Sequence, residues 1–362
     1  MRNPRTAVAR RVAVSLATVG LAAATTFAGS ADPARADRAL LPPEAHTDIA
    51  YTEPVPETTQ GNLLDIYLPA RRADKPLPLF IYTEGSAWFA DTGKSSGAAW
   101  AERLNPYGFA VAGVSVRSSS QTQFPGQLHD IKAAIRYLRA NADTYGLDPD
   151  RFAIGGFSSG AWTAAIAGTA NNVGPDLEGT TGVTGVSSEV QAVVTFAPPT
   201  AFRLMDSQAT EYSVLEHSVP SSPESILTGC TGYPTGIGDP ACTSADLANP
   251  LNYVTPDDPP FLMFHGTHDQ LLPPGQSEVL FEALAENCVA AEFHLVDGPD
   301  HTYDYIDAPG EAPVVGQVVN QVDRHSCRTR SFDGLRPGTV PSVDLVARFL
   351  YRSMGVEAKA RP

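Results

Sequence analysis

The sequence is short of positive charge. Its 25 Lys and Arg residues stand against 40 Asp and Glu residues, which gives the 362-residue chain a formal net charge of −15 at pH 7. An excess of negative charge of this size repels nucleic acid and anionic membrane surfaces. We therefore expect no nucleic-acid partner, and an uncharged partner fits the composition better.

Internal repeats and a Ser/Thr/Pro-rich linker are also missing from the sequence. The chain is 43% hydrophobic and 18% charged, which disfavours disorder and fits one large α/β domain or two small ones. With no linker and no recognisable second module, we expect a single domain over residues 37–362, and we expect it to be a monomer.

The first 36 residues have the pattern of an export signal, with four Arg residues, then the apolar run Val12–Ala28, then Ala34-Arg35-Ala36. Cleavage after Ala36 would remove five Arg and one Asp, leaving 20 basic and 39 acidic residues and a charge of −19. A membrane anchor is the alternative, but Thr, Ser and Gly dilute the apolar run. We expect an extracellular protein without a stable membrane anchor. The general secretory route is one possibility, and Arg10-Arg11 indicates the twin-arginine route as another.

Cysteine is scarce, and all four residues follow the predicted signal. An even number in an exported chain predicts two disulfides, for which three connectivities exist. We favour Cys230 with Cys242 and Cys288 with Cys327, because each bond would close a Gly/Pro-rich loop that otherwise lacks structure. Zinc binding is the alternative. No two cysteines have the short spacing of a zinc knuckle, so we expect no metal.

From Asp48 onward, short β-branched or apolar runs alternate with longer helical patterns, which predicts a mainly parallel sheet flanked by helices. Leu63–Leu68 is expected to be an antiparallel edge strand. The other predicted strands are Leu77–Thr83, Phe109–Val116, Arg151–Gly156, Val190–Ala197, Phe261–His265 and Ala291–Val296. Helical spacing appears after Pro125, after Ser158, after Pro273-Pro274 and over Val343–Met354.

Three stretches break this alternation of strand and helix: residues 171–188, 200–260 and 302–341. We interpret them as insertions. Each follows a predicted strand or a segment that carries a candidate site residue, so we expect them to cover the mouth of the site. Surface decoration is the alternative interpretation.

The segment Gly156-Phe157-Ser158-Ser159-Gly160 follows an apolar strand and precedes a helical pattern. A serine held on so sharp a strand-to-helix turn is a candidate nucleophile, because the closely packed backbones around it require glycine. An ordinary glycine-rich turn is the alternative. We predict that Ser158 is the nucleophile and that Ser159 offers its backbone N–H at the start of the helix.

A serine hydroxyl needs a histidine base that a carboxylate orients, in the chain order Ser, acid, His for a nucleophile of this type. Asp269 follows the strand Phe261–His265 and is the predicted acid. Three other aspartates cluster around the next strand and more plausibly shape its loop: Asp297, Asp300 and Asp304.

His301 is the predicted base, because it follows the strand Ala291–Val296 through a Gly/Pro turn. His325 is the main rival. His294 lies inside the strand and is more typical of a structural histidine.

The reaction also needs donors for the oxyanion, and the loop after Leu77–Thr83 is the expected place. We predict that the backbone N–H groups of Ser86, Ala87 and Ser159 form this oxyanion hole. An ordinary strand-end turn is the alternative.

At these motifs the chain resembles the α/β-hydrolase carboxylesterases, in particular the small bacterial esterases similar to feruloyl and acetylxylan esterases. The resemblance covers roughly residues 62–354, and it rests on Tyr82–Trp88, Phe124–Ala134, the segment around Ser158, Asp258–Phe261 with Asp269, and His301. It departs where the family carries His-Gly-Gly-Gly-Trp and this sequence reads Glu84-Gly85-Ser86-Ala87-Trp88. Because the donors are backbone groups, Ser and Ala can serve where the local φ and ψ permit.

The resemblance implies an α/β-hydrolase fold with inserted loops over the active site and a serine carboxylesterase that needs no cofactor. Plant cell-wall feruloyl or acetyl esters are candidate substrates. A lipase or polyester hydrolase is the alternative, because four aromatic residues could line either an acyl pocket or an open groove: Trp88, Phe89, Tyr303 and Tyr305. These aromatics could equally belong to the core. A peptidase and a non-catalytic binding module of the same fold are further alternatives.

Overall fold

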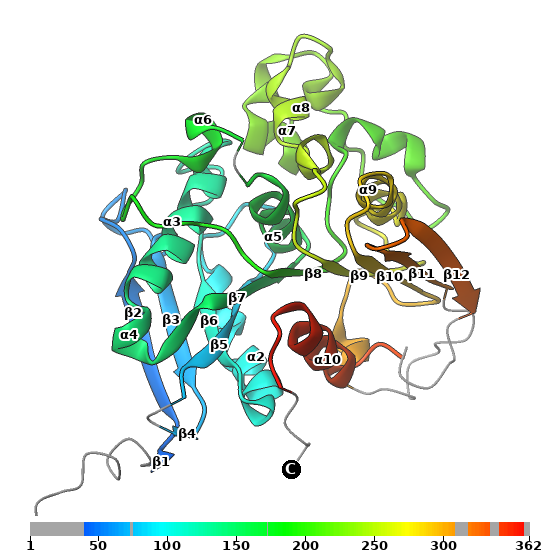
Figure 1. Ribbon diagram of the computed structural model, residues 1–362. Coiled ribbons are helices and arrows are strands. Elements are labelled where there is room, and N and C mark those ends of the chain that lie inside the picture. Colours follow the sequence, from blue (N-terminus) through cyan, green and yellow to red (C-terminus); the bar gives the residue numbers. More distant parts are fainter. Residues whose placement is uncertain (1–39, 73–74, 172, 308–317, 334–339, 358–362) are drawn as a thin grey trace, which may run out of the picture.

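The computed structural model describes residues 40–72, 75–171, 173–307, 318–333 and 340–357, and in this part of the chain ten strands form one sheet (Figure 1). The strand order is β12-β11-β10-β9-β8-β7-β5-β6-β3-β2. The strands are β2 (Glu44–Ala50), β3 (Leu63–Leu68), β5 (Leu77–Thr83), β6 (Ala110–Val114), β7 (Leu147–Phe157), β8 (Ala192–Phe196), β9 (Phe261–Gly266), β10 (Ala291–Val296), β11 (Val318–Asp323) and β12 (Arg328–Asp333). Two short strands, β1 (Leu40–Leu41) and β4 (Arg71–Arg72), pair separately.

The six central strands, β5 to β10, are parallel. On one side β3 pairs antiparallel with β6, and β2 pairs antiparallel with β3. On the other side β11 and β12 extend the sheet as an antiparallel pair. The predicted mainly parallel sheet is therefore confirmed.

Helices cover both faces of the sheet (Figure 1). One face carries α3 (Gly126–Ala140), α5 (Ser159–Thr169) and α9 (Gly275–Glu286), and the other carries α2 (Gly97–Leu104) and α10 (Val343–Ser353). Side chains of a strand alternate between these layers. In β5, Leu79 and Ile81 enter the core under α3 and α5, while Phe80 and Tyr82 enter the core under α2 and α10.

Short helices fill the connections between these elements. They are α4 (Ala142–Tyr145), α6 (Pro175–Glu178), α7 (Pro223–Thr228) and α8 (Ser244–Leu247), with the 3-10 turns η1 (Gly93–Ser96), η2 (Asn105–Tyr107), η3 (Phe202–Leu204), η4 (Asp206–Gln208), η5 (Cys230–Gly232), η6 (Gly236–Gly238), η7 (Pro250–Tyr253) and η8 (Asp304–Ile306). Among the described residues, no helix combines the length and the apolar character that a membrane crossing would need.

Two expectations about the sheet are wrong. Leu63–Leu68 is antiparallel but lies inside the sheet, because Glu44–Ala50 pairs with it from outside. Within the stretch 302–341, which we expected to be an inserted loop, β11 and β12 continue the sheet instead. The predicted signal at residues 1–36 lies outside the described part of the chain.

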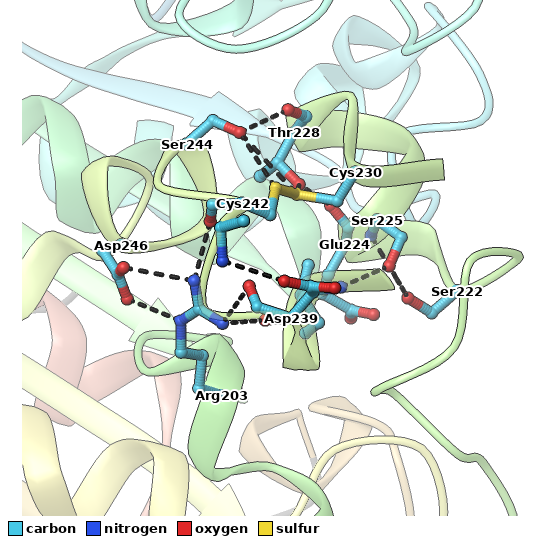
Figure 2. The surroundings of a disulfide bond; sticks show 12 residues. Arg203, Ser222, Glu224, Ser225, Thr228, Cys230, Asp239, Cys242, Ser244 and Asp246 are labelled. Atoms are coloured by element: carbon cyan, nitrogen blue, oxygen red, sulfur yellow. Dashed lines mark hydrogen bonds and ion pairs between the residues drawn. A yellow bond between two sulfur atoms is a disulfide. The ribbon is translucent and has the colours of Figure 1, made fainter. Parts of the chain in front are cut away.

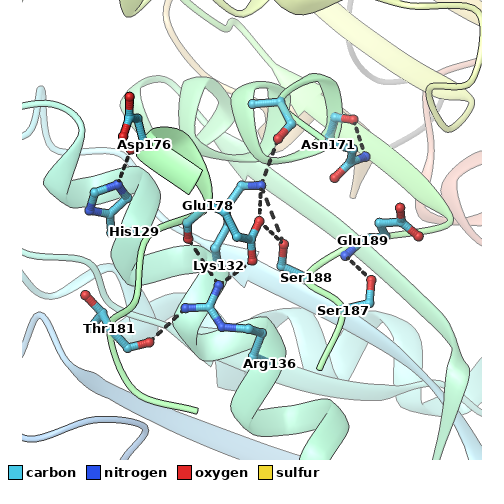
Figure 3. A network of polar contacts seen from close by, with 12 residues as sticks. His129, Lys132, Arg136, Asn171, Asp176, Glu178, Thr181, Ser187, Ser188 and Glu189 are labelled. Carbon is cyan, nitrogen blue, oxygen red and sulfur yellow. Dashed lines mark hydrogen bonds and ion pairs between the residues drawn. The ribbon is translucent and has the colours of Figure 1, made fainter. Parts of the chain in front are cut away.

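The insertion at residues 171–188 packs against α3 (Figure 3). Its residue Glu178 accepts hydrogen bonds from Lys132 Nζ at 2.7 Å and from Arg136, and both cations are buried on α3. The segment starts beyond the C-terminus of α5, and a helix of that length separates its ends by about 15 Å. The segment therefore begins at the end of α5 that lies away from Ser158. This corrects the expectation that it covers the mouth of the active site.

The insertion at residues 200–260 carries α7 and α8 and is closed by the Cys230–Cys242 disulfide (Figure 2). Arg203 holds the closed loop, because its guanidinium donates to the carbonyls of Ile237, Asp239 and Cys242. Figure 2 shows these bonds together with the ion pair between Arg203 and Asp246.

The second disulfide joins Cys288, just after α9, to Cys327 in the turn between β11 and β12, with Cα atoms 4.8 Å apart. It therefore fastens the antiparallel extension of the sheet to the helix layer. Both disulfides have the connectivity that the sequence predicts.

Candidate active site

The carboxyl ends of the parallel strands bring the predicted site residues to one edge of the sheet. The loop with Ser86 and Ala87 follows β5, Ser158 follows β7, Asp269 follows β9 and His301 follows β10. In open α/β sheets this edge is where ligands bind. We name the three loops here the β5 loop (residues 84–92), the β9 loop (267–274) and the β10 loop (297–307).

Ser158 has a strained backbone, with φ 55° and ψ −126°. Its N–H donates to Phe196 O at 2.9 Å, and its carbonyl accepts from Trp162 N at 3.0 Å, so both neighbouring elements hold the turn. A Cβ atom at Gly160 would lie only 2.1 Å from Thr83 O. The glycine of the motif is therefore required by the close approach of α5 to the end of β5. The hydroxyl of Ser158 lies at the N-terminus of α5, where a developing negative charge is favoured.

Asp269 and His301 lie in direct contact. Asp269 Oδ2 is 2.7 Å from His301 Nδ1, and Asp269 Oδ1 accepts from the N–H groups of Leu271 and Leu272 at 2.9 and 2.8 Å. The carboxylate is completely buried. Burial by itself would raise the pKa of Asp269, but hydrogen bonds and charge from His265 and His301 lower it well below its usual range. A carboxylate that stays ionised in this position fixes Nδ1–H as the donor and leaves Nε2 of His301 as the proton acceptor.

The imidazole of His301 packs against the residue that precedes the serine. Its ring centroid lies 4.6 Å from that of Phe157, and its side chain is 11% exposed. Among the described residues, His301 forms its side-chain hydrogen bond with Asp269 and none with the Ser158 hydroxyl. Bonds between a nucleophile and its base are often long in the free enzyme and shorten when substrate binds. The arrangement therefore places an oriented imidazole against Phe157, the residue that precedes the serine.

His265 is a site residue that the sequence analysis did not select. It lies at the end of β9, fully buried, with Nε2 3.3 Å from Asp269 Oδ2 and 3.0 Å from Leu272 O. Its Nδ1 forms a hydrogen bond with the Ser277 hydroxyl at 2.8 Å. The sequence feature that could have identified His265 is its position four residues before Asp269, in the strand that leads to the predicted acid. Its contact gives Asp269 a second imidazole neighbour, because Oδ2 lies 3.3 Å from His265 Nε2 and 2.7 Å from His301 Nδ1.

The β5 loop lies against the start of α5 through Ser159. The Ser159 hydroxyl accepts from Ser86 N at 2.9 Å and from Trp88 N at 3.4 Å. Ala87 and Trp88 both have positive φ, 51° and 60°. Of the three predicted donors, Ser86 N–H thus already has an acceptor within the protein, whereas the N–H of Ala87 forms no hydrogen bond among the described residues.

The four aromatic residues expected to line one pocket do not gather in one place. Trp88 is buried in the core under α3 and α5, against Trp162 and Phe202. Tyr305 is buried in the core on the opposite face of the sheet, and Tyr303 packs against that same core. Phe89 is 55% exposed. The four do not line one shared pocket, because the sheet separates Trp88 from Tyr303 and Tyr305; for Trp88 and Tyr305 the alternative, that they belong to the core, holds.

The rival acids and bases have other partners. His294 Nε2 pairs with Glu292 inside β10, and His325 lies in the exposed turn between β11 and β12. Asp297 accepts from Thr267, and Asp300 accepts from Gln270 and from the His301 backbone. Asp304 begins η8. A candidate acid and a candidate base thus meet in Asp269 and His301, whereas the carboxylate beside His294 is Glu292, which is not a candidate acid.

Comparison with known proteins identifies the family of the chain. Residues 64–284, more than half of the chain, match BD-FAE, the family of bifunctional feruloyl/acetyl esterases. The chain belongs to the BD-FAE family. Membership confirms the resemblance to α/β-hydrolase esterases that the sequence motifs indicate.

Solved structures and curated proteins that are similar to the chain include a carbohydrate esterase and an esterase. A truncated form of a carbohydrate esterase from gut microbiota is 32% identical with a TM-score of 0.61, and the likeness covers 73% of this chain and 90% of that chain. A bifunctional GH43-CE protein of Bacteroides eggerthii is 35% identical with a TM-score of 0.60, over 71% of this chain and 35% of that chain. Esterase LipC of Mycobacterium tuberculosis is 27% identical over 278 residues, which cover 73% of this chain. The chain spans 63% of the length of LipC, less than two thirds.

Proposed function

We propose that this BD-FAE family member is an exported serine carboxylesterase with Ser158 as nucleophile, His301 as base and Asp269 as the carboxylate that orients the base. One observation carries the proposal: the buried Asp269 carboxylate lies 2.7 Å from Nδ1 of an imidazole that packs beside the strained Ser158 turn. This is the arrangement that activates a serine hydroxyl.

The reaction has two halves. His301 Nε2 takes the proton of Ser158 Oγ while Oγ bonds to the ester carbonyl carbon, and the C=O electron pair moves to oxygen. When the tetrahedral intermediate collapses, the C–O bond to the alcohol breaks and His301 gives its proton to the leaving oxygen. Water then repeats the sequence on the acyl-enzyme, which releases the acid and restores Ser158. This scheme uses no metal and no cofactor.

The N–H groups of Ala87 and Ser159 are the proposed oxyanion donors. Ser159 begins α5 directly after the nucleophile, and Ala87 N–H keeps no partner within the described protein. Ser86 N–H can serve only by exchanging its present acceptor, the Ser159 hydroxyl. Its role as a donor remains a prediction, and its present bond stabilises the loop that presents Ala87.

Acetyl or feruloyl esters carried by plant cell-wall polysaccharides are the proposed substrates. Similarity at 32% identity to a carbohydrate esterase from gut microbiota supports this choice. Export is supported by the signal pattern in residues 1–36 and by two disulfides, which persist in oxidising compartments. The protein is proposed to act as a monomer.

A lipase or polyester hydrolase is the second candidate, and exposed apolar side chains beside the β9 loop favour it. Val214, Leu215 and Leu271 are 65%, 43% and 38% exposed, and Val214 N donates to Gln270 O, which places this apolar surface next to the acid loop. An apolar surface beside the catalytic edge would contact a long acyl chain or a polymer.

A panel of substrates separates these functions. We would assay p-nitrophenyl esters of increasing acyl length, a feruloyl ester and acetylated xylan, with a serine-directed inhibitor as control. Preference for short acyl chains together with release of acetate or ferulate would support the first candidate. Preference for long chains would support the second, and an inert response to every ester and to the inhibitor would indicate a binding module.

A further inference from the structure

Glu84 stands at the position where the family to which this sequence is similar carries a histidine, and its carboxylate is fully engaged. Oε1 accepts from Gly85 N at 3.1 Å. Oε2 accepts from the Ser96 hydroxyl at 2.5 Å and from the Tyr303 hydroxyl at 2.9 Å. One side chain therefore connects three segments: the β5 loop, η1 and the β10 loop.

Tyr303 lies two residues after His301 and is held by aromatic neighbours. Its ring centroid is 5.1 Å from Phe157, 5.2 Å from Phe196 and 6.0 Å from Trp100. Phe157 in turn packs on the His301 imidazole. Burial, and next the charge of Glu84, raise the pKa of Tyr303 to about 12. The hydroxyl thus stays protonated and donates throughout the neutral range.

The two loops that this bond joins come from strands far apart in the sheet. Strands β7, β8 and β9 lie between β5 and β10. Among the described residues, the Tyr303–Glu84 hydrogen bond is the one that joins the β5 loop to the β10 loop. The first loop presents the proposed oxyanion donor Ala87, and the second presents His301.

We propose that Glu84 is a positioning residue that, through Tyr303, fixes the His301 loop relative to the oxyanion loop. The role rests on the proposed esterase function. Its physical basis is that base and oxyanion donors must act on the same tetrahedral carbon, so an error of about 1 Å in their relative placement lowers the rate strongly. The hydrogen-bond partners of Glu84 are Gly85, Ser96 and Tyr303 and not Ser158, Asp269 or His301, so Glu84 acts through the two loops.

The test compares Glu84→Gln, Tyr303→Phe and the double variant of the full-length protein, with a short-chain p-nitrophenyl ester as substrate. Gln keeps the size of Glu84 but replaces one acceptor oxygen by an amide nitrogen, and Phe keeps the ring packing of Tyr303 while removing the donor. We expect each single variant to lower kcat about 10-fold while KM changes by less than about twofold. The double variant should lose no more than the larger single loss, because both changes break one connection.

Tyr107→Phe is the matched control. It removes a tyrosine–carboxylate hydrogen bond of similar length, from Tyr107 to Asp344 at 2.7 Å, which lies before the amino end of β6 and away from the catalytic edge. Its kcat should stay within about twofold of the wild type. Complete labelling by a serine-directed inhibitor counts competent sites in every variant, so kcat is expressed per active site and is not lowered by an unfolded fraction.

The positioning role is supported if both single variants lower kcat, the double variant loses no more than the larger single loss, KM is preserved and the inhibitor labels every variant completely. Unchanged kcat in both single variants, or losses that multiply in the double variant, overturn it. If Glu84→Gln does not fold, Tyr303→Phe decides alone, because it retains the aromatic packing. A wild type without ester turnover overturns the proposed function as well, whereas an active wild type with unaffected variants overturns the positioning role alone.

Discussion

His301 Nδ1 lies 2.7 Å from the fully buried Oδ2 of Asp269, and this contact joins the loops that follow two adjacent parallel strands, β9 and β10. A neutral imidazole held in this way must carry its proton on Nδ1, which leaves Nε2 as the base. The pairing thus determines which nitrogen of His301 can accept the proton of Ser158.

Asp269→Asn should lower kcat by about 1,000-fold or more while the protein stays folded. Asparagine has nearly the same shape, but its amide can donate to Nδ1 and so favours the wrong tautomer of His301. Steady-state kinetics on a p-nitrophenyl ester, with circular dichroism as the folding control, measure this effect. Activity within about tenfold of the wild type would show that another carboxylate orients the base.

His265→Ala should reduce both stability and rate. The change leaves the buried Asp269 carboxylate with one imidazole partner instead of two and opens space between β9 and Ser277. We expect a loss of about 2–4 kcal/mol in the free energy of unfolding. We also expect kcat per folded molecule to fall, so that the loss of rate is larger than the unfolded fraction accounts for. Urea denaturation and kinetics per titrated active site separate the two effects. His265→Gln, which can still bond Leu272 or Ser277, should recover part of the stability.

Removal of the disulfides should destabilise the protein, and loss of the disulfide that closes the longer loop should cost more. Cys230 and Cys242 are 12 residues apart, and Cys288 and Cys327 are 39 residues apart. On the chain-entropy account the paired Ser variants lose about 3 and about 4 kcal/mol, respectively. Urea unfolding of each double-Ser variant tests this order. A larger loss for the shorter loop would mean that contacts such as those of Arg203, and not loop closure, dominate.

The buried pair of His217 and Glu224 predicts a pH-dependent contribution to stability. His217 Nδ1 lies 3.1 Å from Glu224 Oε2, and its Nε2 bonds Leu271 O in the β9 loop at 3.1 Å. Burial opposes the charged form, but the hydrogen bond and charge of Glu224, together with Asp206, raise the pKa of His217 above its ordinary value. A raised histidine pKa stabilises the fold fully below the unfolded pKa of about 6.5, and this stabilisation is lost as the pH rises through the folded pKa.

His217→Gln removes the stabilisation that the raised pKa of His217 gives to the folded protein. The difference in unfolding free energy between wild type and variant should therefore be larger at pH 5 than at pH 9, as measured by urea denaturation at both values. An equal difference at the two pH values would show that His217 is neutral in the folded protein.

The sequence was sufficient to select the three proposed catalytic residues because Ser158 directly follows β7, and Asp269 and His301 lie in the loops that follow β9 and β10. Ser158 also lies between glycines that the packing requires, since Gly160 touches Thr83. Parallel strands bring their carboxyl ends to one edge, so strand order along the chain already placed Asp269 and His301 near Ser158.

The sequence could not predict which face of the sheet a side chain enters, nor the polar edge strand, nor the contact between two distant loops. Trp88 and Tyr305 look equivalent in the sequence, but they enter cores on opposite faces. The strand Arg328–Asp333 has mostly exposed polar side chains, so no apolar run marks it. Similarly, nothing in the sequence pairs Glu84 with Tyr303, which are 219 residues apart.

The most direct test of the account is covalent labelling of wild type and Ser158→Ala by a serine-directed inhibitor, followed by intact-protein and peptide mass spectrometry. We predict one adduct per wild-type molecule, located on Ser158, and loss of both the adduct and ester turnover in the folded variant. Labelling of a different serine, or ester turnover retained by Ser158→Ala, would contradict the account.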